Sequence, residues 1–145
     1  MSMNKALQQY SSVRKISGVE AANPHRLIQM LYEGLLERLN MARGCMERKE
    51  YAAKGMHIDR ALAIIQGLQG FLDMEKGGDL AQNLNQLYDY TMIIIYEASR
   101  DLDTSKVDEA ISLIRTIKEG WDGIAQEAEK MFSGDGAADG VRSPA

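Results

Sequence analysis

Residues 25–143 contain no proline, because the two prolines of this 145-residue chain stand at positions 24 and 144. Proline is the strongest helix breaker, so long uninterrupted helices can form anywhere in this stretch. Apolar residues recur in it at spacings of three and four, which is the repeat of an amphipathic helix, and no sustained alternation of period two occurs. The pattern predicts an all-α protein.

The first helix is expected to begin at Asn23 and Pro24, where a capping side chain precedes a proline in the first helical position. It is expected to end near Lys49 or Glu50, since a longer seam would place these charged residues in the core. Its predicted core-facing seam comprises Ile28, Tyr32, Leu35, Leu39, Ala42 and Met46.

Three further helices follow in the same way. The second is expected to run from Tyr51 to the turn at Gly77-Gly78, the third from an N-cap at Asp79, and the fourth from Asp103, Thr104 or Ser105 to Gly134. The predicted seam of the second helix comprises Tyr51, Ile58, Ala61, Ile65, Leu68 and Leu72. That of the third comprises Leu80, Leu84, Leu87, Thr91, Ile94 and Ala98. That of the fourth comprises Val107, Ala110, Ile114, Ile117, Trp121, Ile124, Ala128 and Met131.

Four helices of similar length with short connections pack best as antiparallel neighbours. We therefore expect an antiparallel up-down four-helix bundle over residues 23–132, preceded by an N-terminal arm over residues 1–22. Residues 133–145 are small, polar and glycine-rich, and are expected to be a disordered tail. Trp121 should lie in the core, with its indole N–H bonded to a partner near the bundle edge.

Composition excludes several classes of function. The net charge of −4 gives no sign of nucleic-acid binding. A single cysteine cannot form an internal disulfide and suggests a reducing compartment, and no signal peptide is evident. The longest apolar run is too short to cross a bilayer, so we expect no membrane insertion and a cytoplasmic location.

No group of residues supports catalysis or a cofactor. A di-iron bundle needs two Glu-x-x-His motifs, but Ala22 and Lys54 stand three residues before the only histidines, His25 and His57. Cys45 lies on an apolar flank and is interpreted as a packed thiol rather than a nucleophile. We therefore predict that the protein is not an enzyme and has no metal or cofactor; a bundle that binds a metal, haem or small molecule remains a weak alternative.

Apolar residues outside the seams are the functional signal. The first helix carries Leu27, Met30, Leu31, Gly34 and Met41 there, the third carries Met92, Ile93 and Tyr96, and the arm repeats Leu7, Tyr10, Val13 and Ile16 every three residues. Such a surface predicts partner binding, and methionines suit partners of varied shape. A wider core or a homodimer face would also explain it. The arm could cover the patch until a partner displaces it.

Several of these segments resemble one family in order and spacing. They are Tyr10 and Val13, "AANPHRLIQMLYEG" (Ala21 to Gly34), Gly77-Gly78, "LNQLYDY" (Leu84 to Tyr90) and Trp121. Together they resemble FliS, the cytoplasmic flagellar secretion chaperones. Asn23 replaces the usual Ser or Thr but keeps the capping role. Thr91 and Ser99 replace an expected Met and Asn, so we expect the outer contacts of the third helix to differ from those of the family.

The resemblance implies an antiparallel four-helix bundle that binds the C-terminal segment of flagellin, prevents its premature polymerisation and helps deliver it to the flagellar type III export apparatus. It further implies contact with the export gate and an anti-sigma regulator. The alternative is a structural helical module that forms a homodimer or part of a larger assembly; as a chaperone, the protein should be a monomer or weak homodimer. The residues that the resemblance implicates are Leu7, Tyr10, Val13, Leu27, Met30, Leu31 and Gly34.

Overall fold

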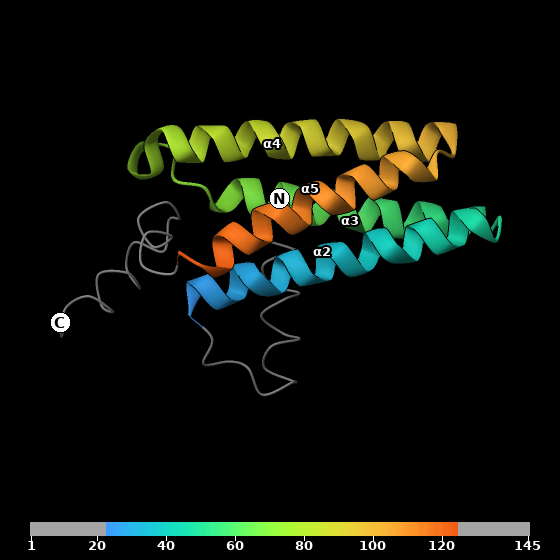
Figure 1. Ribbon diagram of the computed structural model, residues 1–145, viewed down its shortest axis with the longest axis horizontal. Helices are drawn as coiled ribbons and strands as arrows, with labels where there is room; N and C mark the ends of the chain where they lie inside the picture. The colour runs from blue at the N-terminus through green and yellow to red at the C-terminus, as the bar shows by residue number, and fades with distance from the viewer. Residues whose placement is uncertain (1–22, 125–145) are drawn as a thin grey trace.

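The computed structural model describes residues 23–124, which form four helices and no strand. The helices are α2 (Pro24–Glu47), α3 (Tyr51–Phe71), α4 (Met74–Asp101) and α5 (Thr104–Asp122), shown in Figure 1. The all-α fold class is thereby confirmed. The arm over residues 1–22 and the tail over residues 133–145 lie outside the described residues.

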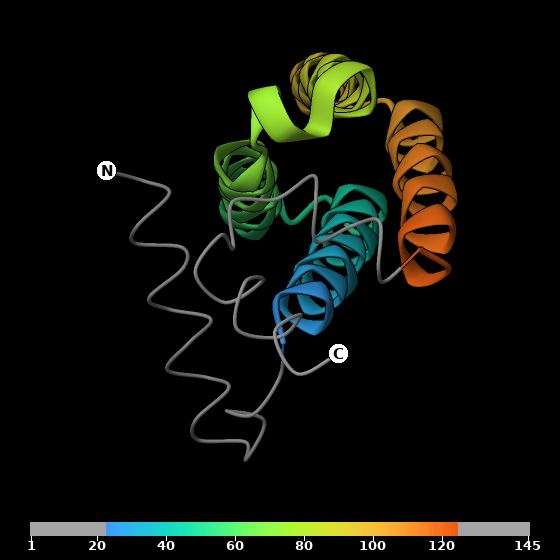
Figure 2. The ribbon, with the colours of Figure 1, turned by 90° about the vertical axis from the view of Figure 1, so that its left-hand side faces the viewer.

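The helices form a four-membered ring in which α2 and α4 are each flanked by α3 and α5 (Figure 2). Contacts between the ends of neighbouring helices establish the antiparallel order. Arg43 near the end of α2 pairs with Asp108 near the start of α5, and Lys54 near the start of α3 donates to the carbonyl oxygen of Ser99 near the end of α4. The up-down topology follows from the short connections, as expected.

Side-chain caps fix the starts of α2 and α5. The Asn23 side-chain oxygen accepts a hydrogen bond from the Arg26 N–H at 2.8 Å, and Asp103 caps α5 by accepting from the Ser105 N–H at 3.0 Å. The cap expected at Asn23 is confirmed, and of the three candidates for the start of the fourth helix the structure selects Asp103. The first helix ends at Glu47, close to the predicted boundary, and Lys49 takes the left-handed conformation (φ 59°) that glycine usually supplies.

The end predicted for the second helix at Gly77-Gly78 is wrong, because α3 ends at Phe71, although the helical backbone is interrupted at Gly78. The chain turns at Leu72 and Asp73 instead, and the Asp73 carboxylate caps α4 by accepting from the N–H groups of Glu75 and Lys76. Gly78 lies inside α4 as a kink with φ 53° and ψ −135°, a conformation that requires glycine. The Asp73 cap therefore starts α4 six residues before Asp79, and two helical pieces of α4 meet at a kink at Gly78, just before the position where the third helix was predicted to start.

The seam predicted for the third helix is also partly wrong. Leu80 and Leu87 are 49% and 36% exposed, and the N-terminal half of α4 instead directs Ala81 and Tyr88 into the core. Compared with the predicted seam, α4 is rotated about its axis, because the large ring of Tyr88 reaches the bundle centre and its hydroxyl has a hydrogen-bond partner there. Tyr51 of the second seam is likewise exposed, whereas the seam of α2 is buried throughout, as predicted.

The fourth helix is shorter than predicted. It ends at Asp122, where the Gly123 N–H donates to the carbonyl oxygen of Gly120, rather than continuing to Gly134. Val107, Ala110, Ile114 and Trp121 are buried as expected, while Ala128 and Met131 lie outside the described residues. No helix within residues 23–124 is long and apolar enough to span a membrane.

Two tyrosine hydroxyls meet at the centre of the core. Tyr32 of α2 and Tyr88 of α4 are fully buried, and their hydroxyl groups are hydrogen-bonded to each other. Burial raises the pKa of both phenols above the ordinary value, so both stay protonated and the hydrogen bond persists at any ordinary pH. This contact joins α2 and α4, which lie across the ring from each other.

Removing one of these hydroxyls is expected to be more harmful than removing both. Tyr32→Phe leaves the buried Tyr88 hydroxyl without that partner, which should lower the free energy of unfolding by about 1–3 kcal/mol. The double variant Tyr32→Phe/Tyr88→Phe has no stranded polar group and should lose less than the sum of the single variants. Urea unfolding of all four proteins measures the coupling; strictly additive losses would contradict the assigned pair.

Candidate partner-binding surface

A groove of about 470 Å³ opens on the outside of the bundle between α3 and α4. Its lining is mainly apolar, and the pairing of α3 with α4 is the sparsest of the four between neighbouring helices. Ile93 and Tyr96 remain 55% and 72% exposed at the groove, whereas Met92 is half-buried and packs on the core beneath. The lining residues are Leu62 and Gln66 of α3 and Asp89, Met92, Ile93 and Tyr96 of α4.

The apolar strip predicted on the first helix lies on the side of α2 that faces α3. This side is identified by Arg38, whose guanidinium donates to Nδ1 of His57 in α3 at 3.0 Å. At 100° per residue, the strip residues lie on the same side of α2 as Arg38. They point farther from the bundle core than Arg38 does. Met41 is 41% exposed, and Leu27, Met30 and Gly34 are half-buried.

Leu31 does not belong to this strip. It is 2% exposed and packs in the core beside Ile28 and Leu35. The apolar seam of α2 is wider than an ideal stripe because α2 packs against two neighbouring helices, and Leu31 fills the α3 side of that seam. In this conformation its side chain is not available to a partner.

The strip and the groove flank the same helix. α3 packs against α2 on one side and α4 on the other, and its own outer surface includes the exposed Met56 and the half-buried Ala63. A segment that crosses α3 would therefore contact apolar side chains of three helices. The arm residues Leu7, Tyr10, Val13 and Ile16 lie outside the described residues, so their contribution stays a prediction.

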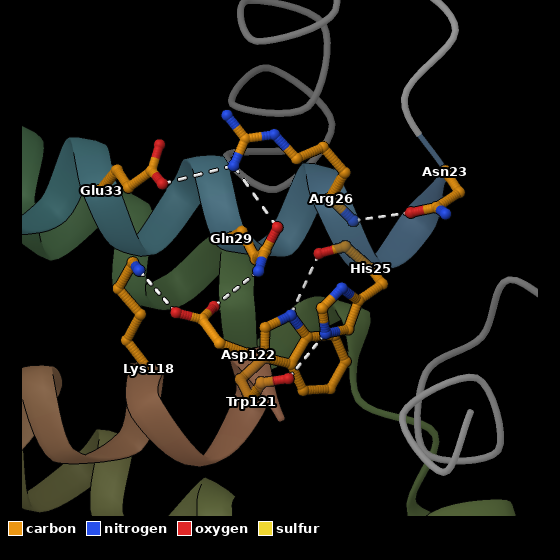
Figure 3. Close-up of polar contacts among 8 residues, drawn as sticks. All are labelled: Asn23, His25, Arg26, Gln29, Glu33, Lys118, Trp121 and Asp122. Atoms are coloured by element: carbon orange, nitrogen blue, oxygen red, sulfur yellow. Dashed lines mark hydrogen bonds and ion pairs between the residues drawn. The ribbon is translucent and has the colours of Figure 1, made fainter. Parts of the chain in front are cut away.

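The end of the bundle near Asn23 is closed by a stacked pair, drawn in Figure 3. The rings of His25 and Trp121 lie 4.8 Å apart, centroid to centroid, and 17° from parallel. Nε2–H of His25 donates to the carbonyl oxygen of Trp121 at 2.6 Å, and the indole N–H of Trp121 donates to the carbonyl oxygen of His25 at 3.1 Å. The predicted burial of Trp121 and its need for a partner are both confirmed.

Polar contacts continue this closure along α2 and α5. Asp122 accepts from the side-chain amide of Gln29 at 2.7 Å and from the ammonium of Lys118 at 2.7 Å (Figure 3). Desolvation raises the pKa of Asp122, but these two hydrogen bonds outweigh it and hold that pKa below its ordinary value. The carboxylate therefore stays ionised at neutral pH and joins the start of α2 to the end of α5.

His57 gives the bundle a pH dependence. Desolvation and the nearby charges of Arg38 and Arg60 lower its pKa, so the unfolded chain binds a proton more readily than the folded protein. The free energy of unfolding should fall as the pH drops below about 6.5, the ordinary histidine pKa, toward the lower folded-state pKa. His57→Gln should reduce this decline, as measured by urea unfolding at pH 7 and pH 5; an unchanged decline would assign it to other groups.

Cys45, interpreted from the sequence as a packed thiol, is buried in the bundle. Cys45 is buried at 3% exposure, and its sulfur lies 3.9 Å from a guanidinium nitrogen of Arg48. Within residues 23–124 no three His, Cys, Asp or Glu side chains come together in a way that could hold a metal ion. The candidate functional site of the described structure is the exposed apolar surface around the groove between α3 and α4.

Comparison with known proteins gives consistent matches along most of the chain. The family model described as "Flagellar protein FliS" matches residues 5–128. The flagellar secretion chaperone FliSB of Pseudomonas aeruginosa is 50% identical over 121 residues, which cover 83% of this chain and 96% of that protein. The flagellar secretion chaperones FliS of Vibrio cholerae and Salmonella typhimurium are 38% and 37% identical, over 92% and 84% of this chain and 98% and 91% of their own lengths.

Proposed function

The chain belongs to the FliS family of flagellar secretion chaperones, and from this premise we propose that its α2–α3–α4 surface captures the C-terminal segment of flagellin before export. The observation that carries the proposal is the exposure of Ile93 and Tyr96 around an apolar groove between α3 and α4. Exposed apolar surface of this kind is typical of interaction sites.

The mode of recognition is helix-in-groove binding. An amphipathic helical segment would place its apolar residues at positions i, i+3, i+4 and i+7 against Leu62, Met92 and Ile93. Met92 in the groove and Met41 on α2 have flexible side chains that adapt to the shape of the bound segment. Capture removes from solution an apolar segment that would otherwise associate with other copies of itself.

Capture in the bacterial cytosol would be followed by handover. We propose that the loaded chaperone presents flagellin to the export gate, and that an anti-sigma regulator competes for or shares the chaperone. The protein is proposed to act as a monomer or weak homodimer and without catalysis, since groove binding requires neither a nucleotide nor a metal. The proposal of these partners is based on the family resemblance. The proposal of the binding surface is based on the exposed apolar residues.

The arm over residues 1–22 is proposed to cover the apolar surface in the free chaperone, through Leu7, Tyr10, Val13 and Ile16. These apolar residues recur every three positions in a short, otherwise polar arm, which favours docking on an apolar surface over folding as an independent helix. Deletion of residues 2–16 should therefore increase the fluorescence of a dye that binds exposed apolar surface. Unchanged fluorescence would count against the cover.

Size-exclusion chromatography with light scattering tests the proposed capture. The full chain mixed with flagellin should elute as a one-to-one complex, and flagellin lacking its C-terminal segment should not bind. A constitutive dimer whose mass does not respond to flagellin would contradict the proposal and favour a structural module instead.

A further inference from the structure

The run Leu87-Tyr88-Asp89-Tyr90 divides its side chains among different surfaces of α4. Tyr88 enters the core, and Tyr90 points to α5, where its hydroxyl donates to a Glu109 carboxylate oxygen at 2.8 Å. Asp89 instead lines the groove between α3 and α4. Of the three polar side chains in this run, Asp89 is thus the one that neither enters the core nor bonds to α5.

Asp89 is the only charged residue lining the groove in the described part of the chain. Its Oδ1 accepts a hydrogen bond from the Gln69 side-chain amide at 2.7 Å, and that amide also donates to the Asn85 side-chain oxygen at 3.1 Å. The contacts with α3 hold the carboxylate in place beside the apolar groove. Among residues 23–124, no group donates a hydrogen bond to the second oxygen, Oδ2.

A carboxylate in this position makes the groove selective. When a helix covers the groove, Asp89 loses water, and a buried charge without a partner strongly opposes binding. A lysine or arginine on the incoming helix compensates by pairing with Oδ2, whereas an acidic residue at the same place adds repulsion. Repulsion of this kind excludes wrong partners as effectively as the apolar contacts attract the right one.

We propose that Asp89 is a specificity-determining residue, and that the segment seated in the groove is an amphipathic helix whose lysine or arginine pairs with Asp89 while its apolar residues contact Leu62, Met92 and Ile93. The proposal rests on the proposed function and adds the charge that the cargo segment must carry. It also predicts that the affinity falls with rising ionic strength through this one pair.

Titration calorimetry with the C-terminal segment of the flagellin from the same genome tests the pair. Asp89→Lys should weaken binding at least about tenfold, and Asp89→Asn should weaken it less and flatten the dependence on salt concentration. Glu119→Lys is the matched control, because Glu119 is an exposed carboxylate on α5 and its replacement by lysine changes the net charge by the same amount. The affinity of this variant for the segment should stay within about twofold of that of the wild type.

A charge reversal in the segment completes the test. If one basic residue of the segment pairs with Asp89, its replacement by glutamate should weaken binding to the wild type and restore binding to Asp89→Lys. Absence of rescue at every basic position, or equal effects of Asp89→Lys and Glu119→Lys, would overturn the inference.

The inference and the proposed function fail in different ways. If Ile93→Asp abolishes binding while the Asp89 variants bind like the wild type, the groove receives flagellin but does not select by charge. If Ile93→Asp also binds like the wild type, flagellin does not use this groove, and both the proposed site and the inference are wrong.

Discussion

Ile93→Asp is expected to weaken binding of flagellin on the order of 100-fold, the largest functional effect of any single substitution in the groove. Burying an isoleucine side chain contributes roughly 1.5–3 kcal/mol, and the substitution also places a second carboxylate close to Asp89. The stability of the folded chaperone should change little, because Ile93 is more than half exposed and surface substitutions usually change stability by less than about 0.5 kcal/mol. Calorimetry and thermal unfolding of the same preparation separate the two effects.

Leu102→Asp is the matched control for Ile93→Asp. Leu102 is another exposed apolar residue of the same bundle, but it lies at the connection between α4 and α5 and not in the groove. Aspartate tolerates the left-handed conformation that Leu102 adopts. Binding should be retained in this variant. Equal losses in the two variants would mean that net charge, or exposed apolar surface in general, determines binding.

Ile114→Ala is expected to lower the free energy of unfolding by about 2–5 kcal/mol, the largest effect on stability that we predict. Ile114 is fully buried on α5 and belongs to the core cluster that all four helices share. Alanine would leave a cavity that the surrounding helices can close only in part. Urea unfolding measures the loss.

Leu87→Ala is the matched comparison for Ile114→Ala. Both residues occupy seam positions by sequence, yet Leu87 is 36% exposed, so its truncation should lower the free energy of unfolding by less than about 1.5 kcal/mol. Equal losses for the two variants would show that Leu87 packs in the core after all and that the orientation of α4 is wrong.

The helices could be predicted from local signals because these signals act over a single turn. Asn23 and Asp103 cap the helices that follow them, as their sequence positions suggested. Gly77-Gly78 marks a real interruption of the helical backbone at Gly78 but not the end of α3, because the cap at Asp73 starts a helical turn before the glycines. The orientation of α4 could not be predicted, since it depends on the meeting of Tyr88 with Tyr32, which lie far apart in the sequence.

The candidate site was predicted in part. Surplus apolar residues on α4 correctly indicated that Ile93 and Tyr96 remain exposed, because no seam could include them. Leu31 was assigned to the same surface only because the assumed seam was too narrow. The contribution of α3 to the groove through Leu62 and Gln66 was missed, although the apolar residues on every side of that helix were a signal available in the sequence.

Methyl NMR of the full chain, with and without flagellin's C-terminal segment, tests most directly whether the groove receives the cargo. The methyl signals of Leu62, Met92 and Ile93 should shift or broaden on addition of the segment, while the signal of the buried Ile114 stays in place. If only the signals of Leu80, Leu87 and Leu102 shift and those of the groove residues do not move, the proposal that the groove receives the cargo is contradicted.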